Sequence, residues 1–386
     1  MTVSEGRPVD VAVIGGGIIG TAAALELTRG GASVALFEAT AIGAGASGRN
    51  SGSVQHPFDQ VLAPLHRATL ERYRRLAEEA PDWFAFPTAP AGLLLLAPES
   101  DRALLEAEQA VIRTSAPELD PELFDAAELM HLEPMLAPDL AAVRLQTGFP
   151  IPPAGAVRAF SRLARREGAQ LEIDAAVSLD RGGSARSVAV RTADGRRVPA
   201  GSVLVAAGPW SPDIADPTGR WRPIVRTWGV TVATRLARPP VHVLEQVGVT
   251  SVNRLDSAER GADPEAHFES TFSLVTAAGV SVVGSTFLPE EPDPDSVGRL
   301  LMHRADRFVP GLRAAQVDEV RACARPQSVD GRPLVGRLPD EENVFIAAGH
   351  GPWGISTGPA TARLVAELIL GRPVAIPAEL DPARFA

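Results

Sequence analysis

The sequence contains no lysine and a single cysteine, Cys323. All 37 basic residues are therefore arginines, which excludes Schiff-base chemistry and a lysine general base but leaves carboxylate recognition by a guanidinium group available. One cysteine cannot form an internal disulfide, and the first ten residues lack the charged-then-apolar pattern of a secretion signal. We therefore expect the protein to remain in a reducing cytoplasm.

Long apolar runs and excess positive charge are also missing. The longest obvious apolar stretch, residues 93–97, is far shorter than the roughly 18 residues of a membrane helix, so we expect no membrane span. The formal net charge of -10 gives no broad positive field for a phosphate backbone, which argues against nucleic acid as a partner. The length of 386 residues exceeds what one hydrophobic core usually supports and favours two domains.

The first forty residues have the pattern of a βαβ unit. Residues 9–14 are typical of a short buried strand, and a glycine turn at residues 15–17 leads into a helix-favouring run over residues 21–27. Residues 32–37 predict a second buried strand that ends at Glu38. Dinucleotide-binding folds normally begin with such a unit.

The glycines of this unit have the spacing that a dinucleotide requires. Gly15 permits the tight turn, Gly17 lets the backbone approach a pyrophosphate, and Gly20 lets the helix pack against the strand. Glu38 follows Gly20 after eighteen residues and is able to accept hydrogen bonds from a ribose. The alternative is a glycine turn without a ligand and a surface glutamate.

The rest of the chain alternates between α/β and antiparallel β patterns. Helices are expected over residues 65–79, 103–113, 155–167 and 359–370, strands over residues 171–173, 203–205 and 344–346, and antiparallel strands over residues 225–234 and 271–286.

The loop at residues 42–52 reads Ile-Gly-Ala-Gly-Ala-Ser-Gly-Arg-Asn-Ser-Gly, too rich in glycine and serine for a packed element. With this loop after its second strand, the chain resembles the D-amino-acid oxidase superfamily of flavoproteins, which includes glycine oxidase, D-amino acid dehydrogenase and sarcosine oxidase. Further segments that resemble the family lie at residues 203–211, 325–336 and 348–359, in the family's order. The resemblance thus covers the whole chain and implies FAD as the cofactor.

The matched positions imply which residues contact FAD. Ser47, Gly48, Arg49 and Asn50 correspond to positions along the flavin phosphate and ring edge, although Arg49 and Asn50 could instead only brace a surface turn. The full set of expected cofactor contacts is Gly15, Gly17, Ile18, Ile19, Gly20, Glu38, Ala39, Ser47, Gly48, Arg49, Asn50, Ser51, Val177, Ala207, Gly208, Trp210, Cys323, Gly349, Gly351, Gly354, Ile355, Ser356 and Thr357.

The last helix has an electrostatic use. Reduced flavin carries negative charge near N1 and the C2 carbonyl, and a helix N-terminus at residues 357–360 would stabilise it. Pro359 suits a first helical turn. The alternative is a surface helix that ends at Gly371.

Arg325 is the candidate for substrate recognition. Its guanidinium group is able to bind a carboxylate in bidentate fashion and to orient the substrate Cα–H toward flavin N5. In glycine oxidases the arginine of the matching Arg-Pro dipeptide has this role. The alternative is that Arg325 pairs with a structural acid such as Asp330. A second arginine of glycine oxidase has no match here, because Pro352 and Trp353 occupy that stretch.

Further catalytic-site candidates are aromatic or imidazole side chains. Trp228 and Trp353 are expected in the cavity wall, although each could be a core aromatic. Tyr73 is the only tyrosine, which makes a tyrosine lid improbable. His350 could hydrogen-bond the flavin or accept the substrate ammonium proton, or could be a satisfied polar group. The other histidines show no metal-ligand spacing.

These observations predict an α/β fold with a Rossmann-like FAD-binding domain and a mixed, largely antiparallel-sheet substrate domain. The expected FAD domain is discontinuous, over residues 1–86, 150–220 and 322–386. Residues 87–149 and 221–321 are expected to form the substrate domain. Binding should occur between the two.

The expected reaction is oxidation of the C–N bond of a small amino acid or amine by hydride transfer from Cα to flavin N5, which gives an imine that hydrolyses. Alternatives are a 2-hydroxy acid dehydrogenase and a flavin-binding subunit of an electron-transfer complex. The acceptor is O2 or another oxidant. Sarcosine oxidases use a lysine to activate oxygen. Because this sequence has no lysine, a dehydrogenase is favoured, although Arg49 could supply the positive charge instead.

Cys323 raises the question of covalent flavin attachment. In sarcosine oxidase a cysteine at a corresponding spacing bonds to the flavin ring, whereas the Arg325-Pro326 pair resembles relatives with unattached flavin. A nearby arginine would lower a thiol pKa and favour attachment, but a lone cysteine is more often a small buried hydrophobe. We predict a non-covalent flavin.

Overall fold

The computed structural model describes residues 8–181, 188–248 and 270–386. One eight-stranded sheet of this part has the order β17-β18-β11-β1-β2-β8, with β10 paired to β11 and β9 paired to β10. Strands β18, β11, β1, β2 and β8 are parallel, and β17 runs antiparallel at one edge. The strands are β1 (Val9–Ile14), β2 (Val34–Glu38), β8 (Gln170–Ile173), β9 (Val177–Arg181), β10 (Val188–Thr192), β11 (Arg197–Val205), β17 (Leu334–Arg337) and β18 (Val344–Ala348).

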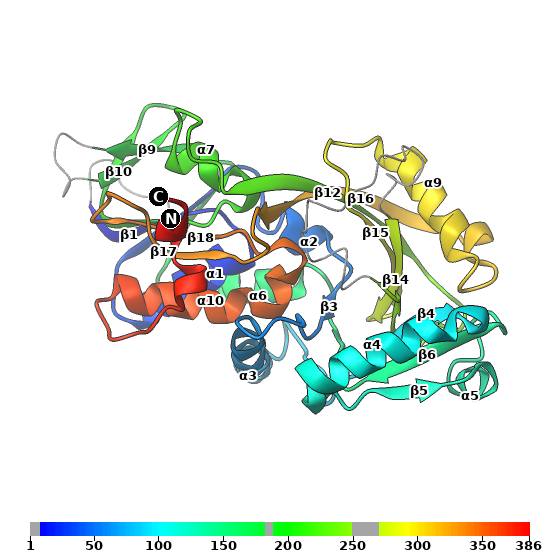
Figure 1. Cartoon of the computed structure of the whole chain (residues 1–386). Helices are drawn as coiled ribbons and strands as arrows, with labels where there is room; N and C mark the ends of the chain where they lie inside the picture. Colours follow the sequence, from blue (N-terminus) through cyan, green and yellow to red (C-terminus); the bar gives the residue numbers. More distant parts are fainter. Residues whose placement is uncertain (1–7, 182–187, 249–269) are drawn as a thin grey trace.

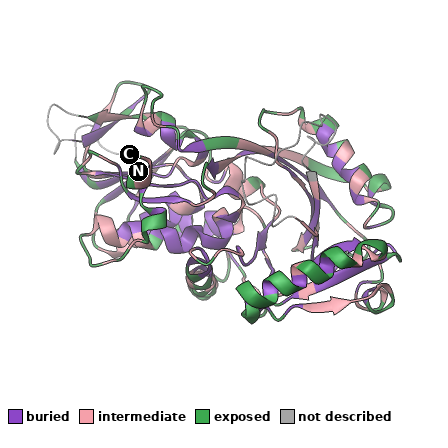
Figure 2. Ribbon diagram, in the orientation of Figure 1, coloured by how far each residue is buried: buried purple, intermediate pink, exposed green. Residues whose placement is uncertain are grey.

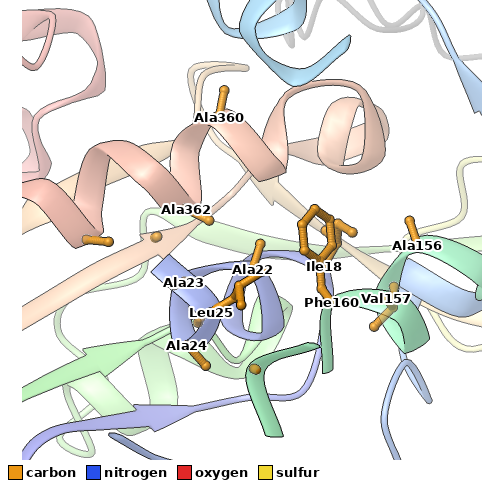
Figure 3. Close-up of a cluster of buried hydrophobic side chains, with 14 of the residues drawn as sticks. Ile18, Ala22, Ala23, Ala24, Leu25, Ala156, Val157, Phe160, Ala360 and Ala362 are labelled. Carbon is orange, nitrogen blue, oxygen red and sulfur yellow. The ribbon is translucent and has the colours of Figure 1, made fainter. Parts of the chain in front are cut away.

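Four helices pack together beside this first sheet, and α1 and α10 contact its strands directly. They are α1 (Ile18–Arg29), α3 (Ala63–Glu79), α6 (Gly155–Arg166) and α10 (Gly354–Ile369). Close packing follows from small side chains, because α1 presents Ala22, Ala23 and Ala24, all buried, and α10 presents Ala362 (Figure 3). Short side chains let helix backbones approach closely, and the same helices contribute to one hydrophobic core. The turn before α1 lies at the carboxyl end of β1, next to this core.

The second eight-stranded sheet described has the order β16-β12-β15-β14-β13-β4-β6-β5. Its pairs are antiparallel except β13–β4. Helix α9 (Pro294–Ala305) and helix α5 (Ala126–Leu132) share one core with this sheet, and α4 (Arg102–Ser115) packs on β4 and β6 with an exposed outer face (Figure 2). The strands are β4 (Leu93–Pro98), β5 (Glu122–Phe124), β6 (Leu140–Leu145), β12 (Ile224–Thr234), β13 (Val243–Gln246), β14 (Ser270–Ala277), β15 (Val280–Thr286) and β16 (Val317–Ser328).

Short elements join the two sheets. Strands β3 (Ser53–Val54) and β7 (Phe149–Pro150) pair with each other, and α7 (Ser211–Ala215) follows β11. The long strand β12 runs from the side of α7 toward α9 (Figure 1). The mixed α/β fold with two sheets is the predicted fold class, whereas the exact domain limits stay a prediction.

Two local predictions need correction. The loop at residues 42–52 contains a short helix, α2 (Ala46–Arg49). Helix α10 begins at Gly354, not near Pro359, which lies inside the helix. Proline has no N–H for the Ile355 carbonyl four residues earlier, and the Tyr73 hydroxyl donates to that carbonyl at 2.7 Å instead. The helix therefore continues past a residue that normally interrupts or kinks one.

Candidate active site between the two sheets

A cavity of about 770 Å³ extends from the β1–α1 turn to the second sheet. Its wall includes the glycine turn of the first sheet and Gly229, Thr231, Cys323 and Arg325 of strands β12 and β16. The cavity therefore extends from a glycine turn of the phosphate-binding type to the positively charged Arg325 on the facing sheet. Such a cavity suits a dinucleotide with a small polar ligand beside one end.

The glycine turn leaves room only for backbone. Gly15 has φ +114°, and a Cβ there would collide with the Ala206 carbonyl, while a Cβ on Gly20 would collide with the Gly15 carbonyl. Gly17 is the N-cap of α1, and the Ile18 N–H donates to Ser47 Oγ at 3.0 Å. The first turn of α1 therefore faces the cavity with a favourable dipole for an anion.

Glu38 is fixed at the end of β2. One carboxylate oxygen accepts the Gly16 N–H at 2.7 Å, and the other accepts the Thr40 N–H at 2.9 Å. Glu38, Ala39 and Val177 all line the cavity. The carboxylate is thus held beside the glycine turn, where a ribose would have to lie.

The loop around α2 braces itself and the facing sheet. The Asn50 amide donates to the carbonyls of Ala46 and Ser47, and its oxygen accepts the Gly52 N–H. Arg49 donates to the Ala322 carbonyl at 3.0 Å, and the Arg49 carbonyl accepts from Thr231. Both Arg49 and Asn50 also line the cavity, so their bracing role is compatible with contact with the cofactor, which stays a prediction.

His350 lies at the cavity and is only 1% exposed. Its Nε2 lies 3.0 Å from Thr361 Oγ1, whose own proton is directed to the Thr357 carbonyl. This arrangement favours a proton on Nε2 and leaves Nδ1 as an acceptor without a partner among the described residues. Burial lowers the pKa of His350 to about 3, so the ring is neutral near pH 7.

Arg325 lies on β16 with its guanidinium group over Gly229. Its Nη1 donates to the Thr286 carbonyl at 2.6 Å, its Nη2 donates to the Ser285 hydroxyl, and the group lies 4.6 Å from the Phe287 ring centre. A Cβ on Gly229 would collide with the guanidinium group. Burial lowers the pKa of Arg325, which is the expected direction for a cation removed from water.

Arg325 has no carboxylate partner in the described part of the chain. Asp330, the structural acid considered as its partner, instead binds Arg384 at 2.7 Å and Ser328. The pairing of Arg325 with Asp330 is therefore wrong. The reason is that β16 ends at Ser328, before Asp330, while Arg325 points back across β12.

Cys323 is 7% exposed and faces the same cavity. Burial raises the pKa of this thiol, and the opposing effects of Arg325 and Arg49 do not reverse that direction. The neighbouring arginines act in the expected direction and lower the Cys323 pKa, but desolvation is the larger effect and the pKa is raised overall. The thiol is protonated near neutral pH.

Some expected site residues lie behind the cavity wall. Trp353 is 7% exposed and packs in the core 6.4 Å from the Phe58 ring, and Trp228 exchanges backbone hydrogen bonds with Leu288. Neither tryptophan is among the lining residues of this cavity. The same holds for Gly20, Gly48, Ser51, Gly349, Ser356 and Thr357, which support the neighbouring turns and helices.

Other lining residues were not anticipated. Gly229 and Thr231 line the cavity from β12, and Ser285 positions the guanidinium group of Arg325. A glycine inside a strand pattern signals close approach by another group, so Gly229 carried a usable signal. Ser285 had no such signal in the sequence, because its contact with Arg325 depends on which strands pair.

The described residues offer neither a metal site nor a membrane-spanning helix. They contain no group of three or more metal-binding side chains placed to hold an ion. No helix among them is long and apolar enough to cross a membrane.

Known proteins resemble this chain over nearly its full length. A glycine oxidase of Bacillus licheniformis is 29% identical over 385 residues, which cover 95% of this chain and 94% of the relative. A crystal structure of glycine oxidase from Geobacillus kaustophilus superposes with a TM-score of 0.82 at 24% identity and covers 98% of this chain and 99% of the other.

An iminodiacetate oxidase from a Chelativorans species superposes with a TM-score of 0.80 at 26% identity, over 96% of this chain and 98% of the other. Residues 10–368 match the model of the FAD-dependent oxidoreductase family abbreviated DAO. This match spans both sheets, the glycine turn and helix α10, so FAD is the cofactor of this chain. The chain belongs to the FAD-dependent oxidoreductase family of the D-amino-acid oxidase superfamily.

Proposed function

We propose that this enzyme oxidises the C–N bond of an amino acid or N-substituted amino acid whose carboxylate binds to Arg325. The observation that carries the proposal is the guanidinium group of Arg325, which borders the cavity without a carboxylate partner among the described residues. A partly buried cation is costly unless an anion compensates it, and a substrate carboxylate would do so. The relatives named for glycine and iminodiacetate are consistent with such a substrate.

The protein part of the reaction is binding and orientation. Ser285, Thr286 and Phe287 hold the guanidinium group on three sides, which leaves its remaining N–H groups to form charge-assisted hydrogen bonds to a carboxylate. A carboxylate fixed there restricts the attached Cα to one region of the cavity. Such restriction lowers the entropic part of the barrier.

The cofactor would be held by the turn at Gly15–Gly20, by Glu38, and by the loop around α2. FAD supplies the hydride acceptor, so the substrate Cα–H bond breaks and a C=N bond forms. Water then hydrolyses this imine to an oxo acid and ammonia or an amine. The start of α10 at Gly354 lines the cavity, and its dipole would stabilise negative charge on the bound cofactor.

His350 fits a hydrogen-bonding role better than proton removal. A ring whose pKa is lowered to about 3 is a weak base for a substrate ammonium group. Its free Nδ1 would accept a hydrogen bond from cofactor or substrate. The amine is therefore expected to lose its proton to solvent before or during binding.

Replacement of Arg325 tests the proposal. In Arg325→Ala we expect anaerobic flavin reduction by amino acids to lose about 2–5 kcal/mol in kcat/KM, because a positioned charge pair is removed, while FAD remains bound. Arg321→Ala is the matched control, since Arg321 is on the same strand but pairs with Glu319 at 2.8 Å. Equal kcat/KM for Arg325→Ala and wild type would place the carboxylate site elsewhere.

Product analysis separates this reaction from oxidation of a 2-hydroxy acid. Both reactions use a carboxylate clamp, but only C–N oxidation releases ammonia or a free amine. Assays with O2 and with an artificial acceptor then identify the electron acceptor. An inactive but FAD-bound chain in both assays would instead indicate a subunit of a larger complex.

A further inference from the structure

The second sheet contains a buried acid that the proposed reaction does not use. Glu245 on β13 is 9% exposed, and its Oε1 accepts one hydrogen bond, from Gln55 Nε2 at 3.0 Å. Burial raises its pKa to about 7. Among the residues that the structure describes, no arginine or histidine forms an ion pair with Glu245. Its charged form therefore has no counterion from that part of the chain.

The strand register places Glu245 on the cavity side of the sheet. Glu245 is opposite Ser273, Ser273 is opposite Gly284, and Gly284 is opposite Thr231. Side chains of directly paired residues lie on the same face of a sheet. A Cβ on Gly284 would meet Ser273 Oγ at 2.9 Å and the Thr231 methyl group at 3.5 Å, which agrees with this row. Thr231 lines the cavity, so Glu245 ends the row that begins there.

A separate contact ties Glu245 to the other wall. Gln55, which binds Glu245, donates its backbone N–H to Ser356 Oγ at 3.0 Å. Ser356 follows Gly354 and Ile355, which line the cavity at the start of α10. Gln55 therefore lies between Glu245 and the helix end that borders the cofactor. Two independent routes, through the sheet and through α10, connect the acid to residues that line the cavity, although Glu245 is not itself one of them.

Glu245 and Arg325 have opposite charge, and neither has an ion-pair partner within residues 8–181, 188–248 and 270–386. Three strand steps of about 4.8 Å lead from Thr231 to Glu245, and Arg325 lies over Gly229, two residues from Thr231. Allowing for the reach of both side chains, the charged groups are on the order of 10–15 Å apart. An extended molecule with a carboxylate at one end and an ammonium group at the other matches this span. Glycine does not.

We propose that Glu245 is a specificity-determining residue that binds the cationic end of an extended substrate whose carboxylate is held by Arg325. The inference rests on the proposed function and names its substrate class: amino acids with a second amine on the side chain or on an N-substituent. An ammonium group supplies the counterion that the described residues do not provide, and a neutral alkyl chain does not. Discrimination arises because the neutral chain leaves the buried acid without that partner.

Matched substrate pairs test this assignment. Both enantiomers of lysine are compared with those of norleucine, and N-(4-aminobutyl)glycine is compared with N-pentylglycine, by anaerobic flavin reduction. For wild type we expect kcat/KM for the cationic member of at least one pair to exceed that for the neutral member at least about tenfold. This ratio requires only a modest difference in interaction free energy. In Glu245→Gln this ratio should fall at least about tenfold, whereas Glu245→Asp should retain part of it. The ratio does not depend on the active fraction of each preparation.

The possible failures are distinguishable. Reduction by the neutral members with no preference for charge in either pair would overturn the Glu245 assignment and leave the Arg325 clamp intact. An unchanged ratio in Glu245→Gln would also overturn it. Absence of flavin reduction by every member, with reduction by glycine or iminodiacetate, would overturn this inference and leave the proposed function intact. Absence of reduction by those two compounds as well would overturn both.

Discussion

Glu245 illustrates how a single buried residue links stability to pH. Its pKa is raised to about 7 from the ordinary value of 4.5, because burial disfavours the charged carboxylate. Between these values the folded protein keeps the proton and the unfolded chain releases it. Since the folded state then binds more protons, the free energy of unfolding falls as pH rises through this window.

Glu245→Gln removes the titration but keeps an oxygen that accepts from Gln55. We expect the variant to be more stable than wild type at pH 8 by about 3 kcal/mol, and nearly equal to it at pH 4.5. Urea unfolding at both pH values, with FAD at the same excess, measures the difference. A stability difference that does not change with pH would show that Glu245 is ionised in the folded protein.

At the residue scale, the sequence predicted Arg325 as a site residue, and Arg325 lines the cavity, but the sequence did not predict the residues that hold its guanidinium group. The Arg-Pro dipeptide is a local pattern that can be matched directly. Ser285 and Gly229 contact Arg325 only because β15, β12 and β16 are neighbours in a particular register. Register depends on long-range pairing, which a local pattern does not determine. The same limit hid the row that ends at Glu245.

Helix α10 contains a proline in its interior, at a position where the sequence predicted the start of the helix. The preference of proline for a first turn predicted a helix start near Pro359, but the helix begins five residues earlier at Gly354. The carbonyl of Ile355, left without its helical donor, accepts from Tyr73, which is fully buried on α3. A tertiary contact thus replaces the missing helical hydrogen bond.

Tyr73→Phe should therefore destabilise the protein by about 1–2 kcal/mol, because a buried carbonyl loses its donor while the ring packing is kept. Pro359→Ala restores an N–H at the position that bonds the Ile355 carbonyl. In that background, the cost of Tyr73→Phe should become smaller, which chemical denaturation of all four proteins would measure as a double-mutant cycle. An equal cost in both backgrounds would mean that the two groups do not share this carbonyl.

At the scale of the whole molecule, the order of motifs indicated a cofactor sheet and a second sheet, but not the strand order of the second. Strands β4 and β6 come from residues far before β13, yet β4 pairs with β13 in parallel and joins the two parts. That pairing buries Leu94 and Leu96 with Leu244 in one core. Apolar runs predict burial but do not choose the partner strand.

Cys323 of β16 and Arg49 of α2 line the same cavity between the sheets, so covalent attachment of a flavin bound there would depend on the assembled molecule. Covalent attachment requires a thiolate, and burial raises the pKa of Cys323 despite both arginines. We therefore expect one FAD per chain that acid or heat releases completely from the denatured polypeptide. Absorbance and fluorescence of the separated protein measure this. Flavin that stays with denatured wild type but not with Cys323→Ser would establish a covalent bond and a pKa lowered by the bound cofactor.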